Sequence, residues 1–425
     1  MTLLIVFTIL GLIVLWSFFF SKKKYVLARL LLAIWLFSIG LAQLRLSPLE
    51  DVWTMSFWGL LAFFFVLFFI SHRYFLKYFK KKIKGNRNDI KTNGKWSFWV
   101  LLTMTVFSVI ANLYIYSRFG TLPILSTIPD KMRFIINDEV FGVWEYLALL
   151  PRIYIPVTFV VLLLSKIESR VYKLFIWLNI LFGFVILSFY ASRLIIIIAL
   201  LMCFFAYLII RRKEINFTKT ILSGLTVAIA VLAISVAIPM FRQSITYRDY
   251  YGADRKDAFN YILDISKLNI PEKYGWITPL YIAPTFNLQT LMKSTEYYKI
   301  GDYELGQYNL SVFSSAFRIV GVELTDVEPQ WKQIFLPWWI TATFLQSYWV
   351  DYGIVGIVIA AIFWGALLAG IYAWAIKRSS AIAVLMFAYF SFVVIMSVYT
   401  NYFLRPELFL DLILISVVGW MLQKK

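Results

Sequence analysis

The chain has 425 residues, of which 61% are hydrophobic and only 15% are charged. Soluble domains carry about 45–50% apolar and about 25% charged residues, so this composition excludes a soluble enzyme and a disordered protein. The formal net charge of +18 would suit nucleic acid, but the basic residues gather in short segments between apolar runs, and we expect no nucleic-acid partner.

Eleven apolar runs follow one another along the chain, and most approach the roughly 20 residues that a helix needs to cross a bilayer. We therefore predict an all-α polytopic membrane protein with about eleven transmembrane helices. Residues 1–240 hold eight spans and an external loop at 118–151, residues 241–351 form a large, partly helical external loop, and residues 352–425 hold three spans. The runs are 3–20, 25–44, 52–70, 97–117, 143–164, 174–190, 194–210, 220–240, 352–376, 381–403 and 408–422.

Basic residues gather on one side of this arrangement. Six segments hold 23 of the 41 lysine and arginine residues, with only three acidic residues among them. Cytoplasmic segments of membrane proteins carry such an excess. With eleven spans, the N-terminus is expected outside and the C-terminus in the cytoplasm. The six segments are 22–24, 71–95, 166–173, 211–219, 377–378 and 424–425.

The segment 241–351 is too long for a simple connector, and loops of this length usually carry function. Twenty of residues 241–340 are aromatic, and ten of these are tyrosines. The spacing of apolar residues predicts helices within 254–268 and 284–298. Such aromatic side chains suit the apolar faces of sugar rings, or an amphipathic lid on the bilayer surface, and the sequence leaves both interpretations open.

Arginines are the first candidates for chemistry on the outer side. Arg193 lies in a three-residue external turn, and its planar, permanently charged guanidinium matches a phosphate group. The alternative is an arginine that only reaches toward the lipid head groups. Five loop arginines could add to an outward-facing site for an anionic ligand. These candidate substrate-binding residues are Arg133, Arg242, Arg248, Arg255 and Arg318.

Two carboxylates are further candidates. Asp351 lies where a predicted span begins. It could cap that helix, or act as a base that accepts a proton from a hydroxyl. Asp411 enters the last span six residues after Arg405, which we expect to be its partner in substrate binding. Tyr348 precedes Asp351 and is also expected to contact substrate. We expect no metal and no cofactor, because His72 is the only histidine, it lies beside a basic cytoplasmic segment, and Cys203 is the only cysteine.

Three stretches resemble segments of bacterial oligosaccharide repeat-unit polymerases of the Wzy type. The first has Gly120 and Pro123 followed by Asp130 and Arg133, and the second is Ser192–Arg193 followed by an apolar helix and a basic end. The third runs from 341 to 353 and continues through Gly356 and Gly365. Their order and the large external loop before the last stretch match the family. Some members show an arginine, ten intervening residues and then a glycine in external loops, and the external loops of this chain hold no such pair.

The resemblance implies a GT-C-like membrane glycosyltransferase in the bacterial cytoplasmic membrane. Its reaction would transfer a glycan from undecaprenyl pyrophosphate to a sugar hydroxyl of a second lipid-linked repeat unit at the outer leaflet. The implied partners are undecaprenyl-pyrophosphate-linked oligosaccharides, the lipid bilayer, a chain-length regulator and a flippase. Arginine, with Arg193 foremost, would stabilise the leaving pyrophosphate, and Asp351 is the candidate base.

Three other functions stay open at this point. An O-antigen ligase would use a similar donor with a lipid A-core acceptor. A flippase or other transporter of lipid-linked oligosaccharides belongs to a different class, and would be expected to show short loops, internal repeats and more charge within its spans. A structural scaffold in a secretion assembly is compatible with the composition.

Overall fold

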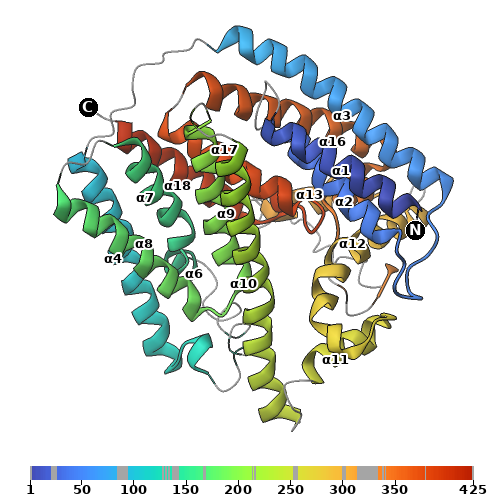
Figure 1. Cartoon of the computed structure of the whole chain (residues 1–425), viewed down its shortest axis with the longest axis horizontal. Helices are drawn as coiled ribbons and strands as arrows, with labels where there is room; N and C mark the ends of the chain where they lie inside the picture. The colour runs from blue at the N-terminus through green and yellow to red at the C-terminus, as the bar shows by residue number, and fades with distance from the viewer. Residues whose placement is uncertain are drawn as a thin grey trace. The chain divides into compact units, whose positions relative to one another are not determined.

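The computed structural model describes most of the chain as helices (Figure 1). Within the described residues every regular element is an α-helix or a 3-10 helix, which confirms the all-α prediction. Only the backbone is described for 94–96, 217, 239–240, 242–251 and 257–261. The described residues are 2–20, 26–83, 94–126, 129, 132, 135, 143–165, 169–212, 214, 217–251, 257–298, 303–313, 334–336, 339, 341–378 and 380–423.

Eight segments of the described chain are long and apolar enough to cross a membrane, which confirms a polytopic membrane protein. Each of the eleven predicted apolar runs falls on a helix. Eight runs fall on these candidate spans, and the other three fall on α2 (Leu27–Ala42), α17 (Ala381–Met396) and α18 (Pro406–Gln423). The eight comprise α1 (Thr2–Phe20), α3 (Met55–Lys82), α4 (Gly94–Phe119), α6 (Val143–Ala148) with α7 (Pro151–Leu164), α8 (Arg170–Phe189), α9 (Arg193–Ile210), α10 (Phe217–Tyr251) and α16 (Phe344–Lys377).

Two of these helices extend beyond the predicted runs. Helix α10 has 35 residues, about 52 Å at 1.5 Å per residue, which exceeds the ~30 Å hydrocarbon core. Helix α16 begins eight residues before the predicted start of its span at 352. In α10 the backbone stays helical into polar sequence, which hydropathy does not mark, whereas in α16 the added residues form a separate helical segment before Gly353, whose φ and ψ are not helical.

The chain forms two compact units, with one boundary after residue 84 and the others within α11 (Asp257–Ser266), α16, α17 and α18. Unit 1 comprises 1–84, 262–374 and 393–410, and unit 2 comprises 85–261, 375–392 and 411–425. Each unit is described by itself.

An aromatic cluster forms the centre of unit 1. The centres of the Trp35 and Phe64 rings each lie 5.7 Å from the centre of the Phe344 ring, and that of Trp364 lies 4.7 Å from it. All four side chains are fully buried. The indole N–H of Trp35 donates to the hydroxyl of Ser397 at 2.9 Å, so the one polar atom of that ring is satisfied. This cluster fixes the first turn of α16.

The described part of the large insertion belongs to unit 1 from residue 262 onward, and the residues before 262 belong to unit 2. It includes α11 (Asp257–Ser266), a 3-10 turn (Glu272–Ile277), α12 (Thr278–Tyr297) and the short α13 (Gln307–Leu310), so the two helical stretches predicted from periodicity are present. Helix α12 packs against α2 and buries a row of polar side chains. These are Thr285, Asn287, Gln289, Thr290 and Ser294.

Unit 2 is built around α7, which packs against α8 and α9. Gly183 lets α8 approach α7 closely, because a Cβ at this position would lie 2.7 Å from the side chain of Ile155 in α7. A short polar chain crosses the same region, in which Asn179 donates to Thr105 at 2.6 Å and accepts from Thr158 at 3.2 Å. Helix α10 packs on α9, and none of its most apolar stretch is buried.

Candidate functional site

Helix α16 is broken at Gly353, whose φ of 56° and ψ of −132° lie outside the helical region. A positive φ of this kind is routine for glycine alone. In an unbroken helix the carbonyls of Val350 and Asp351 would accept from residues 354 and 355. Here they accept hydrogen bonds from the backbone N–H groups of Glu304 and Leu305, at 3.1 and 3.0 Å. The break therefore attaches part of the large insertion to the start of α16.

Two further glycines after the break allow close backbone contacts. A Cβ on Gly356 would overlap the carbonyl oxygen of Tyr348, so the helix folds tightly back on itself here. A Cβ on Gly365 would lie 2.5 Å from the Ser71 hydroxyl, which itself donates to the carbonyl of Ile362 at 3.1 Å. The three glycines of the third resembling stretch thus have separate roles in shape: a break, a fold-back and a contact with α3.

Asp351 is fully buried and both of its carboxylate oxygens accept hydrogen bonds. One oxygen accepts from the backbone N–H of Tyr308 at 3.0 Å, and the other from the backbone N–H of Asn309 at 2.8 Å and from the Asn309 side-chain amide. These backbone groups belong to the single turn of α13. The carboxylate therefore satisfies the start of α13, not the start of its own helix, which begins at Phe344.

A small polar network surrounds this carboxylate. The amide of Asn309 also donates to the carbonyl of Ser347 at 3.0 Å, and the amide of Asn401 donates to the Ser347 hydroxyl at 2.7 Å. Tyr348, a predicted substrate-binding residue, is 9% exposed, and its ring lies 6.4 Å from Phe344. Asp351 and Tyr348 thus lie one turn apart in the first part of α16, with little of either surface open.

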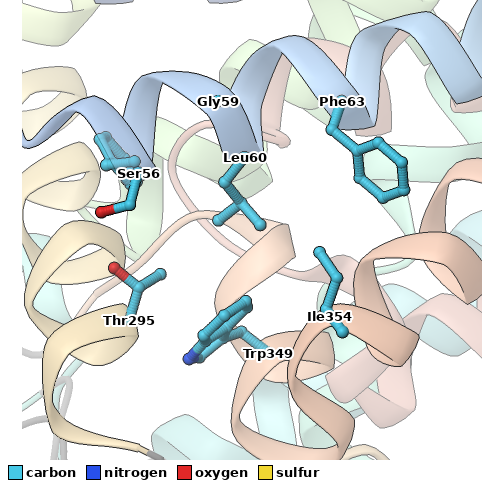
Figure 2. Close-up of a pocket in the computed structure, with 8 residues that line it drawn as sticks. Ser56, Gly59, Leu60, Phe63, Thr295, Trp349 and Ile354 are labelled. Carbon is cyan, nitrogen blue, oxygen red and sulfur yellow. The ribbon is translucent and has the colours of Figure 1, made fainter.

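A pocket of about 280 Å³ lies beside the break in unit 1 (Figure 2). Trp349 and Ile354, on either side of Gly353, line it from α16. The hydroxyls of Ser56 on α3 and Thr295 on α12 face each other at one end, while Phe63 closes the other end in the view of Figure 2. The remaining lining residues are Phe57, Gly59 and Leu60 of α3.

The pocket is preorganised by its neighbours. The indole N–H of Trp349 donates to the carbonyl of Ser294 at 3.1 Å, which fixes the ring at the pocket wall. Gly59 leaves open space, since a Cβ built there meets no atom within 4 Å. A rigid aromatic plane, two hydroxyls and apolar side chains form a lining that can hold the apolar face of a sugar ring and hydrogen-bond its hydroxyls.

Comparison of the chain with protein-family models, with curated proteins and with solved structures gives no match. The chemistry of the site therefore rests on its own geometry. Among the described residues, no group of three or more histidine, cysteine, aspartate or glutamate side chains could hold a metal ion.

The segment between α2 and α3 adds two acidic residues close to α12. Glu50 accepts from the Tyr281 hydroxyl at 2.7 Å and from the Ser47 backbone at 3.1 Å, and its burial raises the pKa of its carboxyl above the ordinary value. Asp51 forms an ion pair with Lys293, and its hydrogen bond raises the pKa of that lysine. The sequence indicated neither contact, because both partners lie more than 200 residues away.

A buried ion pair lies in unit 2, where Asp411 meets Arg152. The guanidinium donates to one carboxylate oxygen from Nη2 at 3.0 Å and from Nε at 3.3 Å. Tyr146 donates to the same oxygen at 3.1 Å, and Tyr389 to the other at 2.9 Å. The side chains of the arginine and the aspartate are 6% and 3% exposed. Four helices, α6, α7, α17 and α18, are thus joined through one carboxylate.

The expected pairing of Asp411 with Arg405 is therefore wrong. Arg405 belongs to unit 1, where its guanidinium lies 5.7 Å from the centre of the Tyr402 ring. Sequence proximity favoured Arg405, but the true partner lies 259 residues away. The available signal was Arg152 itself, a charged residue well inside the apolar run 143–164, because such a charge requires a partner in the protein interior.

The remaining arginine candidates are described in part. Arg193 begins α9, and its Nη1 donates to the carbonyl of Ser235 on α10 at 3.1 Å, which links the two helices. Arg133, Arg255 and Arg318 lie outside the described residues, as do the side chains of Arg242 and Arg248.

Proposed function

We propose that this chain is a polysaccharide polymerase of the bacterial cytoplasmic membrane, with eleven spans and a GT-C-like fold. It transfers a glycan from undecaprenyl pyrophosphate to a sugar hydroxyl of a lipid-linked repeat unit at the outer leaflet. The observation that supports this most is the pocket beside Gly353. It is lined by an oriented tryptophan and two hydroxyls, and the stretch that resembles repeat-unit polymerases contributes Trp349 and Ile354 to its lining.

The position of the pocket along its helices agrees with chemistry on the outer side. It is lined by the first turns of α3 and by the region of α16 around its break. The basic residues of these two helices lie toward their C-terminal ends: Arg73, Lys77 and Lys80–Lys82 in α3, and Lys377 in α16. Because basic ends favour the cytoplasm, the pocket ends of both helices are expected outside.

The hydrogen bonds of Asp351 favour a positioning role in this reaction. Both oxygens hold the first turn of α13, so the carboxylate fixes the segment 303–313 against α16. We propose that stabilisation of the departing pyrophosphate by arginine carries most of the catalysis, as preorganised charge does in other enzymes.

Arg193 is our leading candidate for that contact. Its guanidinium is oriented by the carbonyl of Ser235, and a two-point contact to phosphate depends on the planar fork. We therefore expect Arg193→Lys to insert normally and to lose roughly 10²–10³ in rate, by analogy with a removed oxyanion donor. Full activity of Arg193→Lys, with a normal amount of the protein in the membrane, would exclude the phosphate contact and leave Arg193 with only a structural role, the link between α9 and α10.

The test of the function itself uses the purified full chain in lipid vesicles with single lipid-linked repeat units as both donor and acceptor. We expect a ladder of products that grows by one repeat unit, without lipid A-core and in excess chelator. A ligase would form no ladder under these conditions. Dependence of the ladder on added magnesium would contradict an arginine-based mechanism.

A transporter is the second candidate, and the buried pair of Arg152 and Asp411 favours it. Ionisable residues inside apolar helices commonly mark transport pathways. A deletion strain separates the two functions. We expect single lipid-linked units to accumulate at the outer leaflet, open to a glycosidase added outside the cells; units that stay protected inside would support a flippase.

A further inference from the structure

Besides the pocket in unit 1, the structure has a cavity in unit 2 that has no role in the proposed reaction. It is an open groove of about 460 Å³ between α9 and α10, with Phe159 of α7 as part of its wall. Helix α9 contributes Leu200, Cys203, Phe204 and Tyr207, and α10 contributes Lys219, Leu222, Ser223, Thr226 and Val227. Both sets follow the spacing of three and four residues that places side chains on one helix face.

The groove is polar at one end and apolar at the other. Helices α9 and α10 are consecutive and packed together, so Tyr207 near the end of α9 and Lys219 near the start of α10 mark the same end. Phe159, Leu200 and Val227 make the rest apolar. From Lys219 to Val227, α10 rises about 12 Å, which fits within one leaflet of the ~30 Å hydrocarbon core.

The polar end carries positive charge from two sources. Lys219 lies in the first turn of α10, whose N-terminal backbone N–H groups also favour an anion. Arg211 and Arg212 follow the end of α9; Arg211 is paired with Glu214, the one acidic residue among the described residues from 207 to 219, and Arg212 donates to the carbonyl of Ile376 at 3.0 Å. By the positive-inside pattern this end lies at the cytoplasmic surface, where anionic lipid head groups collect.

Helix α10 also needs a partner on this face. Its leucines and isoleucines are widely exposed, with Leu222 at 64% and Ile229 at 58%. In its most apolar stretch no residue is buried within the structure. An acyl chain in the groove would cover part of this surface and hold α10 against α9.

We propose that the groove between α9 and α10 binds one acyl chain of an anionic phospholipid, with the lipid phosphate at Lys219. This site is independent of the proposed polymerase reaction. The lipid acts here as a structural ligand of the cytoplasmic leaflet.

The test uses the full chain in vesicles that contain a phospholipid with a photoreactive group in its acyl chain. The lipid is supplied either as phosphatidylglycerol or as phosphatidylcholine, and the cross-linked residues are mapped by mass spectrometry. We expect phosphatidylglycerol to label residues 200–227 about fivefold more than phosphatidylcholine, the preference that one lysine at an anionic membrane surface gives. Equal labelling by the two lipids, or no labelling in 200–227, would overturn the proposal.

Three variants sharpen this result. Lys219→Gln should reduce phosphatidylglycerol labelling to the phosphatidylcholine level, whereas Lys173→Gln, an exposed lysine in the first turn of α8, should leave the preference intact. Thr226→Phe places a ring in the groove at an exposed position and should lower labelling by both lipids. Unchanged labelling in Lys219→Gln or in Thr226→Phe would exclude the assigned site.

Discussion

Two buried carboxylates in this chain are held by opposite means. In unit 1, Asp351 accepts hydrogen bonds from two backbone N–H groups and one side-chain amide, all neutral donors. In unit 2, Asp411 accepts from the guanidinium of Arg152 and from two tyrosine hydroxyls. The first arrangement fixes a stretch of backbone, and the second joins side chains of four helices.

This difference determines whether a second substitution can compensate for the loss of each carboxylate. Both members of the pair in unit 2 are side chains, so an apolar pair could replace them without leaving an uncompensated charge. The backbone donors that face Asp351 remain whatever side chains surround them, so no second substitution can replace that carboxylate. We therefore expect rescue at Asp411 and none at Asp351.

The largest effect is expected at the ion pair. Arg152→Met should destabilise the protein by about 3–5 kcal/mol, because it leaves the buried carboxylate of Asp411 without its cation. Adding Asp411→Leu should recover a large part of this loss. Unfolding of the single and double variants in detergent, combined as a double-mutant cycle, gives the coupling free energy. Additive losses would contradict the description of Asp411 and Arg152 as one unit.

A smaller loss is expected for Asp351→Asn. The new amide cannot accept from the Asn309 donors as a carboxylate does, and hydrogen bonds to charged groups contribute about 1.5–3 kcal/mol. Hydrogen exchange should become faster at the backbone amides of Tyr308 and Asn309, and a further Asn309→Ala change should not restore protection. Wild-type exchange at both amides would show that Asp351 does not hold α13.

The broken helix can be tested by two identical substitutions in different settings. Gly353→Ala should cost about 1–3 kcal/mol, since alanine is strained at this positive φ, and its Cβ would also contact Tyr303. Gly59→Ala should instead stabilise helix α3 by up to about 1 kcal/mol, because its Cβ enters open space. Thermal unfolding of both variants checks this contrast, and equal shifts would contradict it.

The smallest effect concerns the pH dependence from Glu50. Burial raises the pKa of this carboxyl above its ordinary value of 4.5, so between these two values the folded protein binds more protons than the unfolded chain. Its contribution to stability is complete below pH 4.5 and is lost as the pH rises through the folded pKa. Glu50→Gln should flatten this part of the stability curve, measured by unfolding from pH 4 to 7. An unchanged slope would assign the dependence to other groups.

The sequence predicted the helices well and the contacts poorly. Apolar runs locate helices because lipid exposure imposes a composition that a single segment reveals, and α9 begins and ends within one residue of its predicted run. The partner of Asp411 was missed because Arg405 is near in sequence whereas Arg152 is near in space. The break at Gly353 was visible only as a glycine in a resembling stretch, since its conformation depends on Glu304 and Leu305.

The most direct test of the proposed function fills the pocket beside the break. Gly59→Phe places a ring in the open space at residue 59, while Val66→Phe adds one at an exposed position two turns along the same helix. Both proteins are compared with wild type for unfolding midpoint and for the length of polymer made from single lipid-linked units in vesicles. Our account predicts that all three fold alike and that only Gly59→Phe makes no product beyond the starting unit. Polymer of wild-type length from Gly59→Phe would contradict the assignment of this pocket to the glycan.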